Sequence, residues 1–246
     1  MTIDVETEAL NAAEKLRPLI PHLSVGVLVD LVGMGNSPCV LSIASAIDLP
    51  PSVCASIAEI SEKKAVIELL KNSKTQIPEF SVLRIIQRFG QCFAVLLALE
   101  DRRDLTVAVW WEILLARLNL ILDCSNPTDQ DEGIEPTNKA ILALLWASPS
   151  RVREAYLEAL NENSAITPAL IIECLNAHFF EVAVLLLSKV SSISPQTIEQ
   201  LFTIENRHKI LELARTIRIP NIILVDFMNA AENNFIDQGE LLRRAA

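Results

Sequence analysis

The feature that most constrains this chain is a helix-start signal that recurs at a nearly fixed interval. An isoleucine or leucine, in most cases with a proline one or two residues later, opens eight successive segments. These residues are Ile20, Leu49, Ile77, Leu105, Ile134, Ile166, Ile193 and Ile219, and the intervals between them are 29, 28, 28, 29, 32, 27 and 26 residues. A repeat of this length is typical of stacked supersecondary units, each of which buries its apolar face against its neighbours.

Apolar residues also recur at fixed offsets from each start. The residue eight positions on is apolar in every segment, and the residue five positions on is apolar in all but one, where Lys139 stands. The offset of five fits a hydrophobic staple, in which the residue before the N-cap packs on the fourth residue of the helix. In one segment Ile166 and Ile171 would form the staple, with Thr167 as N-cap and Pro168 as first helical residue. The same offset pairs Ile20 with Val25.

A period near 28 residues holds about two short helices and their turns. The second helix of a segment is expected to be amphipathic, because apolar residues recur at spacings of three and four residues. This pattern occurs within residues 62–74, 91–103, 148–161, 179–190 and 207–218. Ser148 and Pro149 are expected to be the N-cap and the first helical residue of the helix within residues 148–161. The sequence therefore predicts an all-α fold, an α-α superhelix similar to HEAT-type solenoids, with about eight helical hairpins.

We expect a single solenoid over residues 1–246, with halves at 1–122 and 137–246 joined by an acidic loop at 123–136. Residues 105–123 read as one long helix. The segment 129–133 resembles the front of a calcium loop, but Gly133 is fifth rather than sixth, so a solvated linker is the better interpretation. Helical segments at 5–19 and 233–246 would cap the two ends.

Charge and hydropathy exclude several classes of protein. The formal net charge of −10 disfavours nucleic-acid binding, which needs a basic surface to displace counterions. The N-terminal residues are acidic and lack the apolar core of a signal peptide. The most apolar stretch, 23–47, is interrupted by Gly33, Gly35, Asn36 and Pro38, so it predicts two buried helices rather than a membrane span. We expect a cytoplasmic protein.

The sequence shows no catalytic or cofactor-binding motif. The five cysteines are widely spaced without a CxxC pair, which is typical of reduced, buried thiols. Cys174 and His178 are four residues apart, but one such pair is weak evidence for a metal site. No dinucleotide, phosphate-loop, nucleophile-elbow or zinc-protease motif occurs. We therefore expect no enzyme activity, no cofactor and no metal.

The candidate partner-binding residues are arginines and tryptophans of the N-terminal half. Arg84 and Arg88 lie one turn apart, and Arg102 and Arg103 follow the next helix, so they could form a basic patch; alternatively they are a solvated face that completes helix C-termini. Trp110 and Trp111 are adjacent and cannot both face the same way, so one could be exposed; alternatively both are core.

The C-terminal half resembles a bacterial all-helical family catalogued as domain of unknown function 2336. The resemblance rests on a Leu-Thr-Pro-like start at 166–168, the pair Phe179-Phe180, and a Leu-Pro-like start at Ile219 with Phe227 after it. Residues 101–118 also look like the earlier repeats of that family, whereas 176–178 depart from its usual pattern. The resemblance implies an all-helical bacterial cytosolic protein and carries over no catalytic residues.

Together these observations favour a non-enzymatic scaffold or regulatory adaptor that binds another protein through a concave face. The alternative is a small-ligand sensing module with a cleft between the two halves, near Trp110 and the acidic loop.

Overall fold

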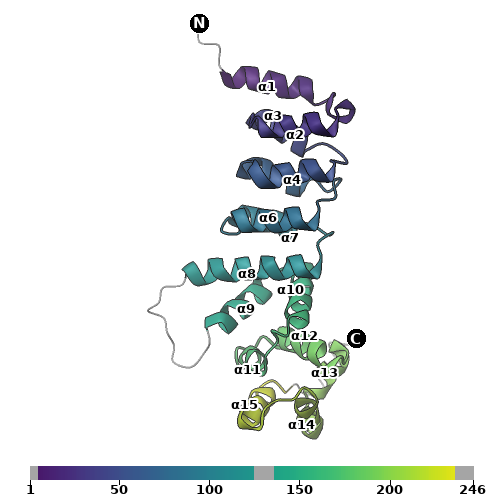
Figure 1. Cartoon of the computed structure of the whole chain (residues 1–246). Helices are drawn as coiled ribbons and strands as arrows, with labels where there is room; N and C mark the ends of the chain where they lie inside the picture. Colours follow the sequence, from purple (N-terminus) through teal and green to yellow (C-terminus); the bar gives the residue numbers. More distant parts are fainter. Residues whose placement is uncertain (1–4, 125–135, 236–246) are drawn as a thin grey trace. The chain divides into compact units, whose positions relative to one another are not determined.

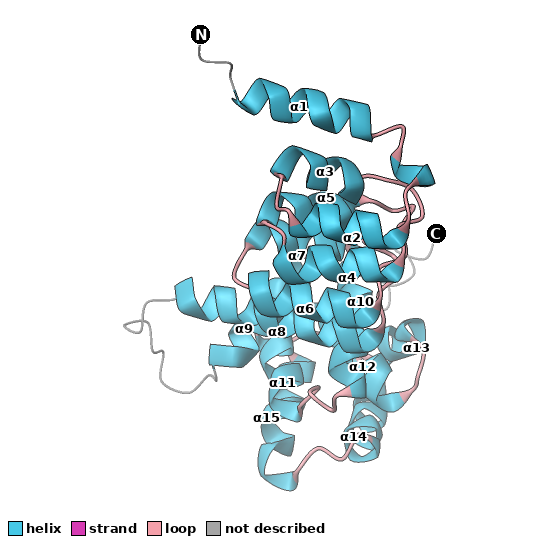
Figure 2. Ribbon diagram, turned by 45° about the horizontal axis from the view of Figure 1, so that its top comes forward, coloured by secondary structure: helices cyan, strands magenta, loops and turns pink. Residues whose placement is uncertain are grey.

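The computed structural model describes residues 5–124 and 136–235, and over these ranges every regular element is helical (Figure 2). The prediction of an all-α fold is confirmed. The elements are α1 (Val5–Leu16), η1 (Ile20–His22), α2 (Val25–Gly33), α3 (Ser37–Ala44), α4 (Pro51–Ile60), α5 (Lys63–Lys71), α6 (Glu79–Phe89), α7 (Phe93–Glu100), α8 (Val107–Cys124), α9 (Pro136–Ala147), α10 (Ser150–Glu162), α11 (Pro168–Asn176), α12 (Phe180–Ser191), α13 (Pro195–Leu201), η2 (Ile204–Asn206), α14 (Arg207–Thr216) and α15 (Asn221–Glu232).

Three expectations from the sequence fall partly or wholly outside the described residues. These expectations are the calcium-like segment 129–133, most of the acidic loop 123–136, and most of the C-terminal cap at 233–246. By their contacts, the residues divide into two compact units, Met1–Leu120 and Ile121–Ala246, which we call unit 1 and unit 2.

The helices of unit 1 form two layers, because each helix packs on the helix two positions along the chain. α1 contacts α3, α3 contacts α5 and α5 contacts α7, while α2 contacts α4 and α4 contacts α6. In Figure 1, α1, then α2 with α3, then α4, and then α6 with α7 lie at successive levels. Helices that are buried on two sides need wide apolar faces. The residues eight positions after each helix-start residue, such as Ile57 and Ile85, are fully buried in this unit.

Unit 2 is built in a related way. α11 contacts both α9 and α15, while α12 contacts α10, α11 and α13. The core is formed by large apolar side chains from both layers, among them Leu170, Phe202 and Phe227, which are fully buried. The layer of α9, α11 and α15 is the one that carries the groove described below.

The helix-start signal has the local structure that the sequence indicates at seven of its eight positions. There the residue five positions on is the fourth residue of its helix, and Cys54, Val82 and Ile171 are examples that are buried. Thr167 caps α11 by accepting a hydrogen bond from the Leu170 N–H at 3.1 Å, and Ser194 caps α13 in the same way.

Two expected helix starts are wrong in detail. After Ile20 the chain makes a 3-10 turn, and α2 begins at Val25 with Ser24 as N-cap, so Val25 is the first helical residue and is exposed. Ser148 does not cap α10, since its hydroxyl donates back to the Leu144 carbonyl at 2.6 Å and closes α9. Pro149 occupies the N-cap position instead, where its fixed φ still sets the chain direction.

Polar side chains connect successive repeats. Asn72, after α5, donates to the carbonyls of Ala44 (3.0 Å) and Ala46 (2.6 Å) in the turn after α3. Thr106 at the start of α8 donates to Glu79 of α6 at 2.9 Å. In unit 2, Lys189 and Glu158 form an ion pair between α12 and α10. These bonds join residues 26 to 31 positions apart, which is close to the interval between helix starts.

Candidate functional site

The groove in unit 2 is lined by residues from α9, α11 and α15. Its volume is about 640 Å³, within the range of roughly 300–1,000 Å³ common for binding pockets. Its lining residues are Asn138, Lys139, Leu142, Ala143, Ala169, Ile172, Glu173, Asn176, Ala177, Phe179, Ile223 and Asp226. We call this the α11 groove.

The helical period explains the lining of the α11 groove. Ala169, Ile172, Glu173 and Asn176 follow one another at three and four positions, so they share the face of α11 opposite its buried residues. The small side chains of Ala143 and Ala169 are exposed and leave the space open. The groove is therefore mostly apolar, with its charged groups limited to Lys139, Glu173 and Asp226.

An aromatic pair lies at one end of the α11 groove. The rings of Trp146 and Phe179 are stacked, with centroids 4.7 Å apart and planes at 14°. Trp146 lies on α9, one turn beyond Leu142, and is 52% exposed. A half-exposed tryptophan beside a groove is a common anchor for a partner. Trp146 is not one of the two tryptophans, Trp110 and Trp111, that the sequence pattern singles out. Its place in the last turn of α9, beside the Ser148–Pro149 break, was the available signal.

Cys174 lies in α11 beneath the groove and is buried. Its thiol donates to the Phe179 carbonyl at 3.3 Å. Burial, and then the nearby Glu173 charge, raise the pKa of Cys174 to about 12. The thiol is therefore protonated at neutral pH and is a poor nucleophile. Cys39 and Cys54 are buried and free as well, while Cys92 is half-buried at the N-cap of α7 rather than inside a helix.

These thiols give a testable prediction. Burial raises the pKa of Cys54 to about 11, so Cys54 and Cys174 should resist alkylation by iodoacetamide at pH 8 in the folded protein and react in urea. Because both pKa values lie above the ordinary value of 9.0, the stabilisation from keeping these groups as thiols is complete below pH 9 and is lost as pH rises toward 11 and 12. Mass spectrometry of tryptic peptides measures the labelling, and rapid labelling of Cys174 at pH 8 would contradict this prediction.

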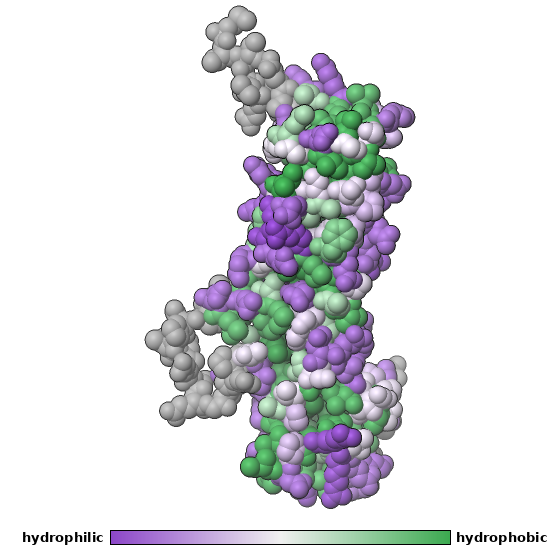
Figure 3. Space-filling view, viewed as in Figure 1, coloured by the Kyte–Doolittle hydropathy of each residue, from purple (hydrophilic) through white to green (hydrophobic). Residues whose placement is uncertain are grey.

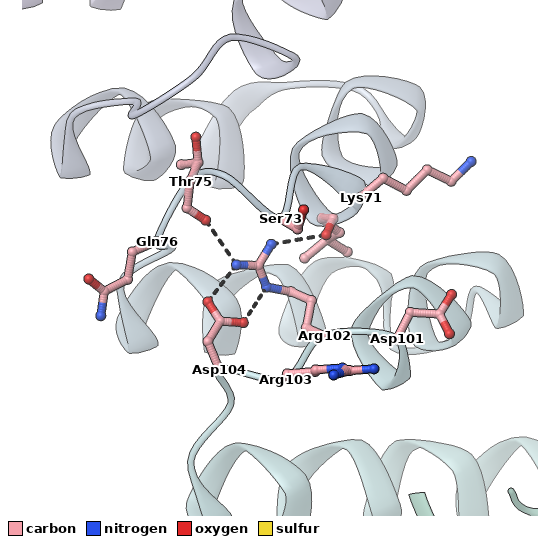
Figure 4. A pocket seen from close by; sticks show the side chains of 9 residues that line it. Lys71, Ser73, Thr75, Gln76, Asp101, Arg102, Arg103 and Asp104 are labelled. Atoms are coloured by element: carbon pink, nitrogen blue, oxygen red, sulfur yellow. Dashed lines mark hydrogen bonds and ion pairs between the residues drawn. The ribbon is translucent and has the colours of Figure 1, made fainter. Parts of the chain in front are cut away.

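A cleft of similar volume in unit 1 contains two of the candidate arginines, but one of them is bound within the protein. It lies over the turns after α5 and α7 (Figure 4). The guanidinium of Arg102 donates to the carbonyls of Leu70 (3.0 Å), Asn72 (3.2 Å) and Thr75 (2.9 Å), and to both Asp104 oxygens. We call this set of bonds the Arg102 clip.

The Arg102 clip is structural in character. The Arg102 side chain is only 4% exposed, whereas Arg103 is exposed and points away from the clip in Figure 4. The fork of the guanidinium matches several carbonyls of the preceding repeat at once, which satisfies acceptors at the C-terminal end of α5. Of the two, only Arg103 presents its charge to solvent.

Arg84 and Arg88 also bond to the preceding repeat. Arg84 makes a bidentate pair with Glu59 at 2.6 and 2.7 Å, and this hydrogen bonding lowers the pKa of Glu59 and raises that of Arg84. Arg88 donates to the carbonyls of Ala58 (2.5 Å) and Ser61 (3.0 Å) at the end of α4. The interpretation as a helix C-terminal partner therefore has direct geometric support for Arg88, whereas Arg84 forms a surface ion pair. A role of either arginine in partner binding stays a prediction.

The two adjacent tryptophans point in different directions. Trp110 is 6% exposed in the core of unit 1, and Trp111 is half-buried. Neither lines the α11 groove. Binding at Trp111 therefore stays a prediction, and Trp146 is the most exposed tryptophan of the described ranges.

Within residues 5–124 and 136–235, no group of three or more His, Cys, Asp or Glu side chains is placed to hold a metal ion. None of the helices in these same ranges has both the length and the hydropathy needed to cross a bilayer.

The described residues define an all-α protein. The profile of a bacterial family described as "Uncharacterised protein conserved in bacteria (DUF2336)" matches residues 20–244. The match covers most of the chain, so the chain belongs to this family. The resemblance found in the C-terminal half is confirmed and extends over the N-terminal repeats. No curated protein and no solved structure matches the chain.

Proposed function

We propose that this protein is a non-enzymatic scaffold or regulatory adaptor, which binds a segment of another protein in the α11 groove. The observation that carries the proposal is the open, mostly apolar groove with a half-exposed Trp146 stacked on Phe179 at one end. Stable protein recognition concentrates in a few aromatic and aliphatic anchors seated in such concavities. Exposed alanines on the groove surface leave room for the side chains of a partner.

The groups around the groove favour binding over catalysis. Catalysis requires an acid, a base or a nucleophile held against a reacting atom. The nearby Cys174 is buried as a thiol, and the ionisable groups lining the groove are Lys139, Glu173 and Asp226. Unit 2 carries 17 acidic and 10 basic residues in its sequence, which disfavours a nucleic-acid backbone as the ligand.

The proposal includes the architecture and the location of the protein. We assign the repeats to a HEAT-like solenoid of about eight helical hairpins, with the layer of α9, α11 and α15 on the concave face. Support comes from the contacts between each helix and its second neighbour in unit 1, and from polar bonds at separations close to the sequence period. The free cysteines fit a cytoplasmic location.

Small-ligand sensing is the second candidate, because a volume of about 640 Å³ also suits a small apolar molecule. A panel of metabolites and nucleotides, scored by the change in tryptophan emission, distinguishes the two functions. A saturable response to a small molecule, without any groove-dependent protein partner, would favour the sensor.

A groove-filling substitution tests the adaptor. Ala169 is the second residue of α11 and lines the groove, while Ala108 is the second residue of α8 and lies outside it; both are exposed. Ala169→Trp should reduce capture of the partner from bacterial lysate at least tenfold, because the indole would occupy the space of the anchors. Ala108→Trp should capture as wild type does. Equal capture by both variants would refute binding in the groove.

A further inference from the structure

The walls of the α11 groove limit how a partner can be recognised. All three walls are α-helices, whose main-chain groups bond along their own helix, and no strand edge occurs in the described ranges. A partner therefore cannot be held by pairing its backbone with a sheet edge. An amphipathic helix can instead lay one apolar face into a hydrophobic groove, with anchors one turn apart.

The apolar surface extends from the groove onto the outer side of α15. Ile223 lines the groove, and on the adjoining face of the same helix Ile222 is 88% exposed and Val225 is 66% exposed. On the face shown in Figure 3, hydrophobic residues reach the surface of unit 2 around the position that Figure 1 gives α15. A surface that runs from Trp146 across the groove to Val225 suits several apolar side chains along a helix better than one compact molecule.

An acidic side chain at the groove favours a partner with basic residues where the two proteins meet. Asp226 is exposed on α15, lines the groove, and has no hydrogen bond or ion pair to any described residue. Glu173 and Lys139 differ, because each already interacts within the protein. A partner with lysine or arginine beside Asp226 gains attraction, and an acidic partner is repelled.

We propose that the occupant of the α11 groove is an amphipathic helical segment of a partner protein, with large apolar side chains on one face and lysine or arginine at the edge that meets Asp226. This inference rests on the proposed function and specifies the chemistry of the partner.

Two synthetic peptides serve as probes, with the full-length protein as receptor. One carries leucines at i, i+3, i+4 and i+7 with lysines at the edge, and its twin carries glutamates in place of the lysines. Fluorescence anisotropy should show that the lysine peptide binds more tightly by roughly threefold or more at low salt, with the difference narrowing as salt rises. Asp226→Lys should reverse the preference.

The control for overall charge is Asp30→Lys. Asp30 is an exposed aspartate of α2 in unit 1, outside the groove, and its replacement changes the net charge by the same amount. Asp30→Lys should leave the preference for the lysine peptide in place, and circular dichroism verifies that both variants fold. If both peptides bind equally, if neither binds, or if Asp30→Lys shifts the preference as much as Asp226→Lys, the inference is overturned. The proposed function is judged separately, by partner capture with Ala169→Trp.

Discussion

Replacing Arg102 with alanine is expected to lower the free energy of unfolding by about 3 kcal/mol, because buried acceptors that lose their donor cost about 1–3 kcal/mol each. The substitution leaves the carbonyls of Leu70, Asn72 and Thr75 without the guanidinium that satisfies them. Two of these acceptor contacts are fully buried, so water cannot easily replace the lost donor. Asp104 contributes less, because its side chain is 39% exposed and its ion pair with Arg102 is partly screened by solvent.

Urea unfolding followed by circular dichroism measures this effect. Arg103→Ala is the matched control, since Arg103 is the next residue and is exposed, and it should change stability by less than about 0.5 kcal/mol. Arg102→Lys should restore only part of the stability, because a lysine lacks the planar fork that reaches several carbonyls. If Arg102→Ala unfolded at the same urea concentration as Arg103→Ala, the structural role of the Arg102 clip would be refuted.

Replacing Phe202 with alanine should cost about 4 kcal/mol, the usual range for emptying a fully buried aromatic position. Phe202 follows α13, has no exposed surface, and packs edge-to-face on Phe180 of α12 with ring centroids 5.1 Å apart. Its loss leaves a cavity between these two helices and removes a favourable ring contact. Since α12 also contacts α11, we expect the α11 groove to lose order together with the core of unit 2.

The control for this cavity is a phenylalanine at the surface. Phe80 on α6 is 61% exposed, and Phe80→Ala should change the free energy of unfolding by less than about 0.5 kcal/mol. Calorimetry or urea unfolding of both variants gives the comparison. Similar stability losses for Phe202→Ala and Phe80→Ala would show that the buried core of unit 2 has been misassigned.

The positions of the helices could be predicted from the sequence because they depend on local chemistry. An apolar residue before the cap, a cap or proline, and an apolar fourth residue are all read within six positions, as at Ile166 to Ile171. The helix-start signal did not predict the first helical residue after Ile20. There the Ile-Pro pair forms a 3-10 turn, because Ser24, four residues later, is a better N-cap. The pattern therefore locates the start of a helix except where a stronger N-cap follows within a few residues.

The roles of the arginines could not be predicted in the same way, because they depend on which turn lies beside them. The spacing of Arg102 from Leu70 and Thr75 is close to one repeat, so their contact exists only when α7 packs on α5. Trp146 was missed for a related reason. Its exposure follows from the way α9 and α11 pack, and its place in the last turn of α9, beside the Ser148–Pro149 break, was the only local signal that set it apart from the buried Trp110.

Site-specific photo-crosslinking tests the proposed groove most directly. A photoreactive phenylalanine analogue replaces Ala143, which is exposed in the α11 groove, or Ala108, which is exposed outside it. After illumination of living bacteria, the proposal predicts a discrete crosslinked band between this protein and a second protein from Ala143, and none from Ala108. Adding Ala169→Trp should remove the band. Crosslinks of equal yield from both positions, or none from Ala143 while a partner is still captured, would contradict binding in the groove.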